Sequence, residues 1–252
     1  MFKFGFSAEE DKSEGEIFKE KQTISWKEAR EVNPNELEKL DQFIEDCSTN
    51  SIEVQNKVIS YISNIDVVLK LINDSNNGEC DGVLTAEENH SDLLVGIYEG
   101  GLKIWECTHD LLNFIEMENL TLKDKKVLDL GCGAGIIGLL CIMKGAICHF
   151  QDYNEEVIRH ITIPNVVINN SIESAEKFRY FSGDWSSYIN LFEKEISEED
   201  KFDYIFTSET IYNPDNYMKL HNVFKSLLKT GGIMYPLLYK LISRNLKSIF
   251  SL

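Results

Sequence analysis

One stretch of the sequence, KVLDLGCGAGIIGLLCIMKGAICHFQD, limits the fold more than any other. It opens with an apolar run from Val127 to Leu130, turns at Gly131 and Gly133, and continues as an apolar segment long enough for a helix. A second apolar run with polar residues at its end, ICHFQDYN, completes the stretch. A strand, a tight glycine turn, a helix and a second strand form one βαβ unit with a right-handed crossover. The stretch therefore predicts a parallel sheet in an α/β protein.

The same alternation continues along the chain. We predict a third strand in FRYFSGDW, a fourth in KFDYIFTSETIYN and the start of a fifth in GIMY. EEVIRHITIPNVVINN predicts a helix that ends before Pro164, followed by a further short element. Another helix begins near Pro214 and is expected to close at Gly231 and Gly232. Alternating strands and helices indicate a Rossmann-like, doubly wound α/β sheet.

The chain divides into four parts. Residues 1–50 are polar and acidic and are predicted to form a largely flexible arm. Residues 51–92 form a helical or irregular lead-in, in which 52–72 fits either a helix or short strands. Residues 93–235 form the main domain, which opens with an amphipathic helix in KIWECTHDLLNFIEM. Residues 236–252 are a divergent tail whose apolar spacing fits a short helix.

Net charge is the compositional feature that bears most on partners. The chain of 252 residues carries a formal charge of −17, which repels nucleic-acid phosphates and attracts basic proteins, although simple solubility also explains it. No apolar run approaches the ~20 residues that span a bilayer, and the first residues lack a signal-peptide pattern. We therefore expect a cytoplasmic protein without a membrane partner. The six cysteines contain no C-x-x-C pair, which favours reduced thiols and no metal site.

The glycine turn has a composition that suits a nucleoside-type cofactor. Gly131 and Gly133 remove side chains where a ligand would approach the backbone at a helix N-terminus. Asp129 precedes the turn, and its carboxylate would repel a phosphate but suits a cationic group such as the amino group of S-adenosylmethionine. Asp152 follows Gly131 by 21 residues, the spacing of an acid that binds ribose hydroxyls. The alternative is a turn in a core that binds no cofactor.

Two further motifs follow the third and fourth strands, at the edge where ligands of open α/β sheets bind. SGDW supplies Trp185, which could stack on adenine, and Asp184, which could accept from its amino group. The alternative is a loop Trp that covers the core. TSETIYN places more polar side chains at this edge, namely Ser208, Glu209, Tyr212 and Asn213. Their alternative role is a strand-to-helix cap at Asn213 and Pro214.

Together these motifs resemble one family, the protein-histidine N-methyltransferases. The likeness is carried by HSDLLVGIYEGGLKIWECTHDLL, KKVLDLGCGAGIIGL, HFQDYNEEVI, FSGDW and SETIYNPDNY, from His90 to Gly232. The resemblance implies a class I, seven-strand methyltransferase fold that uses S-adenosylmethionine to modify a histidine of a large-subunit ribosomal protein. The family's last strands form a hairpin, and the 17 residues after Tyr235 do not resemble that part, so we expect the hairpin to be missing.

The resemblance also implies a cofactor pocket. Glu106 becomes a candidate for the cofactor's ammonium group, with Trp105 and Cys107 as walls, while His109 is a bystander. Gly131 would meet the methionine end, and Ser208 would lie beside the sulfonium. The ribose and adenine would contact the residues after the second and third strands. The complete set of implied cofactor-binding residues is Ile104, Trp105, Glu106, Cys107, Thr108, Gly131, Gly133, Gln151, Asp152, Tyr153, Gly183, Asp184, Trp185 and Ser208.

The expected reaction is methyl transfer to a neutral histidine of a basic ribosomal protein, with no direct binding of nucleic acid. Glu209 or Asn213 would orient the imidazole through its other nitrogen. Such a substrate adds access to the nucleus to the expected cytoplasmic location. The alternatives are a lysine or other protein methyltransferase of the same fold, and a shortened, weakly active relative that acts as a binding factor.

Overall fold

A six-stranded sheet forms the centre of the computed structural model, which describes residues 26–74, 83, 85–86, 89, 91, 93–94, 96–192, 196–208, 210 and 213–237. The strand order is β1-β6-β5-β4-β7-β8. Five strands run parallel, namely β4 (Lys126–Leu130), β5 (Ile147–Asp152), β6 (Arg179–Ser182), β7 (Phe202–Ser208) and β8 (Leu228–Leu237). From β4 the chain adds β5 and β6 on one side of the sheet, and then adds β7 and β8 on the other side. The direction of strand addition therefore reverses between β4 and β7. This arrangement confirms the predicted Rossmann-like, doubly wound sheet.

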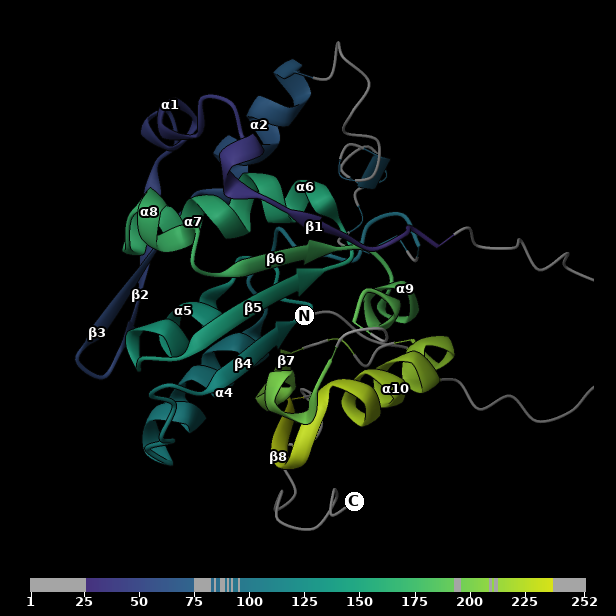
Figure 1. Cartoon of the computed structure of the whole chain (residues 1–252). Helices are drawn as coiled ribbons and strands as arrows, with labels where there is room; N and C mark the ends of the chain where they lie inside the picture. Colours follow the sequence, from purple (N-terminus) through teal and green to yellow (C-terminus); the bar gives the residue numbers. More distant parts are fainter. Residues whose placement is uncertain are drawn as a thin grey trace, which may run out of the picture.

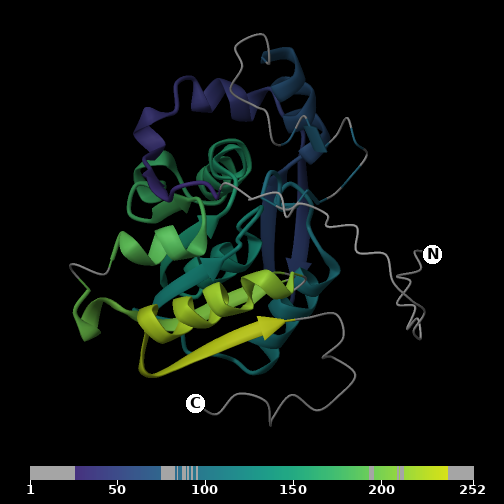
Figure 2. The ribbon, with the colours of Figure 1, turned by 90° about the vertical axis from the view of Figure 1, so that its right-hand side faces the viewer.

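Helices cover both faces of the sheet (Figure 1). On one face, α4 (Glu106–Met117), α5 (Ile136–Met143) and α7 (Ile163–Asn169) enclose the larger apolar core. On the other, α9 (Trp185–Asn190) and α10 (Tyr217–Leu227) pack over a second core. Figure 2 shows α10 lying along β8. Within the described part of the chain, no helix has the length and apolar character needed to cross a membrane.

The N-terminal region is more ordered than expected between residues 30 and 74. The edge strand β1 (Arg30–Val32) pairs antiparallel with β6, because Val32 is buried and Glu31 accepts two hydrogen bonds of 2.7 Å from Arg179. The flexible arm predicted for residues 1–50 is therefore wrong for this part, and residues 1–25 lie outside the described residues. The remaining elements here are η1 (Pro34–Glu36), α1 (Leu40–Glu45), the hairpin of β2 (Thr49–Val54) and β3 (Lys57–Ile62), and α2 (Asn64–Asp74). Both options left open for residues 52–72 thus occur in turn.

Pro164 does not end its helix. The segment runs as α6 (Glu155–Val157), the π-helical turn η3 (Ile158–Thr162) and α7. The wider turn lets the N–H of Ile163 reach the carbonyl of Ile158, and the helix continues past Pro164, which has no N–H to donate. The expected break before Pro164 is therefore wrong. Asn165 on α7 then accepts from Ile62 N at 2.8 Å and donates to Ala134 O at 2.9 Å, which fixes α7 to the β2–β3 hairpin and to the glycine turn.

The C-terminal strand also begins earlier than expected. Leu228 already pairs with Phe202, and pairing resumes at Ile233 after an irregularity that contains Gly231 (φ +79°) and Gly232. These glycines therefore lie within β8 instead of closing α10. Pro236 lies on β8, an edge strand of the described sheet. The predicted helix in the tail falls on residues 238–250, outside the described residues.

A buried histidine gives the fold a measurable pH dependence. His149 on β5 packs against Phe181 and Phe202, and burial, assisted by Arg179 and Lys126, lowers its pKa from 6.5 to about 3. The neutral form is favoured in the folded state, so its contribution to stability is complete above pH 6.5 and is lost as the pH falls toward 3. As the pH falls, protonation of His149 lowers the free energy of unfolding by up to about 1.4 kcal/mol per pH unit, and we expect His149→Phe to abolish this decline.

Chemical denaturation of both proteins between pH 4 and 7 tests this. The difference between the two proteins is the informative quantity, because burial raises the pKa of Asp129 to about 8 and of Asp152 to about 6, and these groups change stability in the opposite direction. Parallel curves for wild type and variant would show that His149 does not carry the effect.

Candidate active site

The glycine turn between β4 and α5 leaves no room for side chains. Gly131 (φ +65°) and Gly133 (φ +49°) adopt left-handed conformations. A Cβ on Gly131 would lie 2.5 Å from the Cγ2 atom of Thr210, and one on Gly133 would lie 2.9 Å from the carbonyl oxygen of Gly101. The turn is therefore enclosed by the segment after β7 and by the loop that precedes α4.

Asp129 stabilises this turn from below. Its Oδ2 atom accepts a hydrogen bond of 2.8 Å from Gly138 N in the first turn of α5, and only 1% of the residue is exposed. Burial raises its pKa to about 8, although the bond from Gly138 opposes that shift. We expected this carboxylate to attract a cationic ligand, but the structure uses it to position α5.

Asp152 and Asn154 connect the turn to the loop before α4. Asp152 is 4% exposed, and its two oxygens accept from Gly133 N and Asn154 N, each at 3.0 Å. The fully buried Asn154 accepts from Glu99 N at 3.0 Å and donates to Ile97 O at 2.8 Å. The end of β5 thus fixes the glycine turn and residues 97–101 in one network.

The N-terminal segment lies against the same edge. Tyr153 donates through its hydroxyl to Gly96 O at 2.9 Å and accepts from Lys27 N at 3.3 Å. The ring of Trp26 meets the Tyr153 ring edge-on, with centroids 6.1 Å apart. Behind them, Lys27 O accepts from Asp184 N at 2.9 Å. Residues 26–29 therefore adjoin the part of the edge where we predicted adenine.

The SGDW motif (182–185) is held in place by hydrogen bonds with Gln151 at the end of β5 and by an ion pair with Lys219 on α10. Gln151 donates to Gly183 O at 2.8 Å and accepts from the indole nitrogen of Trp185 at 3.0 Å. Asp184 accepts from Ser186 N at 2.9 Å, which caps α9, and forms an ion pair with Lys219. Gln151 therefore supports Trp185. The carboxylate of Asp184, predicted to bind adenine, is already engaged by Ser186 N and Lys219.

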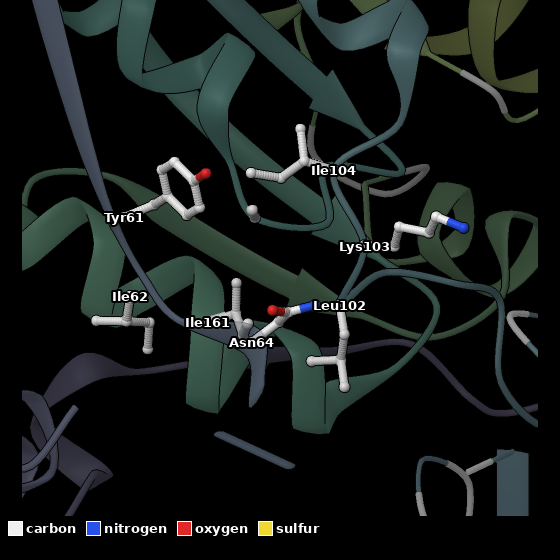
Figure 3. A pocket seen from close by; sticks show the side chains of 8 residues that line it. Tyr61, Ile62, Asn64, Leu102, Lys103, Ile104 and Ile161 are labelled. Carbon is white, nitrogen blue, oxygen red and sulfur yellow. The ribbon is translucent and has the colours of Figure 1, made fainter. Parts of the chain in front are cut away.

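The predicted pocket wall before and within α4 contains residues in different environments. Cys107 is fully buried in the core, whereas Glu106 is exposed in the first turn of α4. Trp105 donates through its indole nitrogen to Gly100 O at 3.2 Å. Ile104 lines a cavity of about 180 Å³ with Tyr61, Ile62, Asn64, Leu102, Lys103, Ala134 and Ile161. Figure 3 shows Tyr61 and Ile104 facing each other there, with the Lys103 side chain directed away. Of the predicted cofactor residues only Ile104 lines this cavity.

The end of β7 supplies the last predicted group. Ser208 has a buried hydroxyl oxygen for which the described residues offer no hydrogen-bond partner. Glu209 and Tyr212 lie outside the described residues. Asn213 accepts from Asp215 N at 3.0 Å and so caps η5 (Pro214–Asn216), the alternative role considered for it.

The edge also contains residues that sequence reasoning did not single out. Trp26 gives no local signal, since it lies in a polar segment, and Lys219 lies on a helix whose apolar stripe faces elsewhere. Lys219 places its nitrogen 3.2 Å from the centre of the Trp26 ring. Asn154 and Glu99 were detectable in principle: Asn154 lies two residues after Asp152, the acid that ends a predicted strand, and Glu99 lies in YEGG, just before the predicted helix.

Comparison with known proteins assigns a family to this site. The model of a family described as "Lysine methyltransferase" matches residues 83–250, beyond Gly232, where we expected the resemblance to end. "Histidine protein methyltransferase 1 homolog" of Bos taurus is 45% identical over 166 residues, covering 57% of this chain and 44% of that protein. The protein of the same name from Dictyostelium discoideum is 43% identical over 145 residues, covering 58% of this chain and 45% of that protein.

The crystal structure of a glycopeptide N-methyltransferase in complex with sinefungin has a TM-score of 0.39 and 14% identity to this chain, covering 51% of this chain and 52% of that one. The chain spans less than half the length of the two curated relatives. The family match, in contrast, covers more than half of this chain. The chain therefore belongs to the protein methyltransferase family of that model, and histidine protein methyltransferases are among its relatives.

Proposed function

We propose that this chain transfers a methyl group from S-adenosylmethionine to a histidine side chain of a basic ribosomal protein. The observation that carries the proposal is the identity of 43–45% to relatives that are named histidine protein methyltransferases. The acidic character of the chain, with a formal charge of −17, suits a basic client. A ribosomal client implies action in the cytoplasm or the nucleus.

The residues at the sheet edge fit S-adenosylmethionine. The glycine turn lies at this edge against Thr210 and Gly101, Asp152 ends the neighbouring strand and Tyr153 follows it, and Trp185 offers a partly exposed ring. Ser208, whose hydroxyl has no hydrogen-bond partner among the described residues, supplies a donor and an acceptor at the end of β7. When bound, S-adenosylmethionine supplies a methyl carbon activated by its sulfonium. Gly131 and Ser208 would hold the methionine end, and the residues after β5 and β6 would hold the nucleoside.

The remaining task of the protein is to orient the acceptor and exclude water. A free histidine has a pKa of about 6.5, so its imidazole is mostly neutral at pH 7 and needs no strong base. The second ring nitrogen carries a proton and is best oriented by an acceptor. Asn213 already uses its side-chain oxygen for Asp215 N. This favours Glu209, the other candidate, as the orienting group.

Lysine is the second candidate acceptor, because the matching family is described by lysine methylation. A lysine amine has a pKa of about 10.4 and must lose a proton before attack. The two acceptors therefore predict different pH dependences. Histidine methylation declines below about pH 6.5 as the substrate protonates, whereas lysine methylation keeps rising through neutral pH.

Transfer of radiolabelled methyl groups to a basic ribosomal-protein fraction tests the proposal. We expect label on histidine after mapping by mass spectrometry, and we expect Glu209→Ala to lower kcat about 10–100-fold. Glu53→Gln, an exposed position on β2, is the control. Label on lysine would replace the proposal with the second candidate. Cofactor binding without any transfer would indicate a binding factor, and unchanged turnover of Glu209→Ala would remove Glu209 from the mechanism.

A further inference from the structure

We propose that Glu99 is an additional cofactor-binding residue, which accepts hydrogen bonds from the ribose hydroxyls. The inference rests on the proposed function, because it assumes a nucleoside cofactor at the carboxyl ends of β4, β5 and β6. It assigns to Glu99 a role that the sequence motifs suggested for Asp152.

Glu99 is held firmly in the loop before α4. Its backbone N–H donates to Asn154 Oδ1 at 3.0 Å, and its Oε1 atom accepts from Gly96 N at 2.7 Å. The other carboxylate oxygen, Oε2, is buried, and no donor within the described residues reaches it. A buried carboxylate oxygen without a donor is unfavourable, so a ligand that supplies one is favoured at this position.

Asp152 is less available for the same role. Gly133 N and Asn154 N each donate to one of its oxygens, and Gly101 packs so closely that a Cβ there would lie 3.2 Å from Oδ2. The carboxylate of Asp152 thus binds the glycine turn to the end of β5. Of the two acids, Glu99 is the one with an oxygen to which no described residue donates.

The charges around Glu99 indicate which kind of ligand would suit it. Burial raises the pKa of Glu99, and the charge of Asp152 adds to that shift, while Lys219 opposes it. Burial raises the pKa of Tyr153, and the charge of Glu99 adds to that shift, so Tyr153 lies in the same environment. A ligand that brings another negative charge here would be repelled, whereas a neutral diol donates two O–H groups. Ribose hydroxyls meet this requirement and phosphates do not.

Binding measurements with ribose analogues separate this role from a structural one. The probes are S-adenosylhomocysteine and its 2′-deoxy and 3′-deoxy analogues, measured by calorimetry with the full chain. We expect the wild type to prefer S-adenosylhomocysteine over at least one deoxy analogue by about 10–100-fold. Glu99→Gln should bind S-adenosylhomocysteine about 10-fold more weakly, bind that deoxy analogue as the wild type does, and so lose most of the preference.

Two comparisons complete the test. Glu53→Gln should keep the wild-type preference, and Glu99→Asp, which keeps the charge but shortens the side chain, should lose it. Both Glu99 variants should match the wild type in far-ultraviolet circular dichroism. A wild-type preference retained by both Glu99 variants would overturn the role of Glu99 alone. Failure of the wild-type chain to bind any of the three probes would overturn the proposed function itself.

Discussion

Replacing Gly133 with alanine is expected to abolish cofactor binding and to lower the free energy of unfolding by about 2–5 kcal/mol. Two costs combine. The residue has φ +49°, which an L-amino acid rarely adopts, and the new Cβ would lie 2.9 Å from Gly101 O, a backbone atom that cannot move alone. Relief of the contact requires the glycine turn and the loop before α4 to separate. That movement also breaks the bond from Gly133 N to Asp152.

Gly231→Ala is the matched control for this prediction. Gly231 also has positive φ, at +79°, but no atom of the described residues lies within 4 Å of a Cβ built there. The free energy of unfolding of Gly231→Ala should fall only by the cost of a left-handed backbone conformation, roughly 1–2 kcal/mol, and its affinity for the cofactor should not change. Denaturant unfolding and calorimetric titration with S-adenosylhomocysteine measure both quantities. Equal losses of stability in the two variants would show that the approach of Gly101 is not important.

The central strands were predictable because each is a short apolar run with a turn signal beside it. The strands β4, β5, β6 and β7 are buried on both faces, and such strands are continuous apolar runs. They can therefore be predicted from the sequence with little knowledge of tertiary contacts. β1 was not predictable, since three residues with only Val32 buried give no periodicity. Its formation depends on Arg179, nearly 150 residues away in the chain.

The candidate site divides in the same way. Residues at or just after strand ends, such as Asp152 and Asp184, were found because parallel strands bring their carboxyl ends to one edge. Their bonding was not foreseen: Asp152 and Asp184 turn inward, to Gly133 N and Ser186 N. Trp26 and Glu99 reach the edge on loops, and loop paths are set by distant contacts such as those from Tyr153 and Asn154.

Phe150→Ala is expected to lower the free energy of unfolding by about 3–5 kcal/mol and to weaken cofactor binding from a distance. The ring is fully buried and stacks on Tyr180, with centroids 5.4 Å apart and planes 8° apart. Its edge lies against the backbone of α5: a Cβ on Gly138 would lie 2.3 Å from the Cε1 atom of Phe150. Loss of the ring leaves a cavity directly under the helix that follows the glycine turn.

The effect on binding separates this cavity from a general loss of stability. If α5 shifts into the cavity, Gly138 N moves away from Asp129. The glycine turn, which this hydrogen bond supports, then changes its conformation. We therefore expect S-adenosylhomocysteine to bind Phe150→Ala more weakly even at temperatures where the variant is fully folded. Tyr217→Ala, which removes a ring that is 48% exposed, should change stability by less than about 1 kcal/mol and leave affinity unchanged. Wild-type affinity in folded Phe150→Ala would show that the glycine turn holds its shape without support from the core.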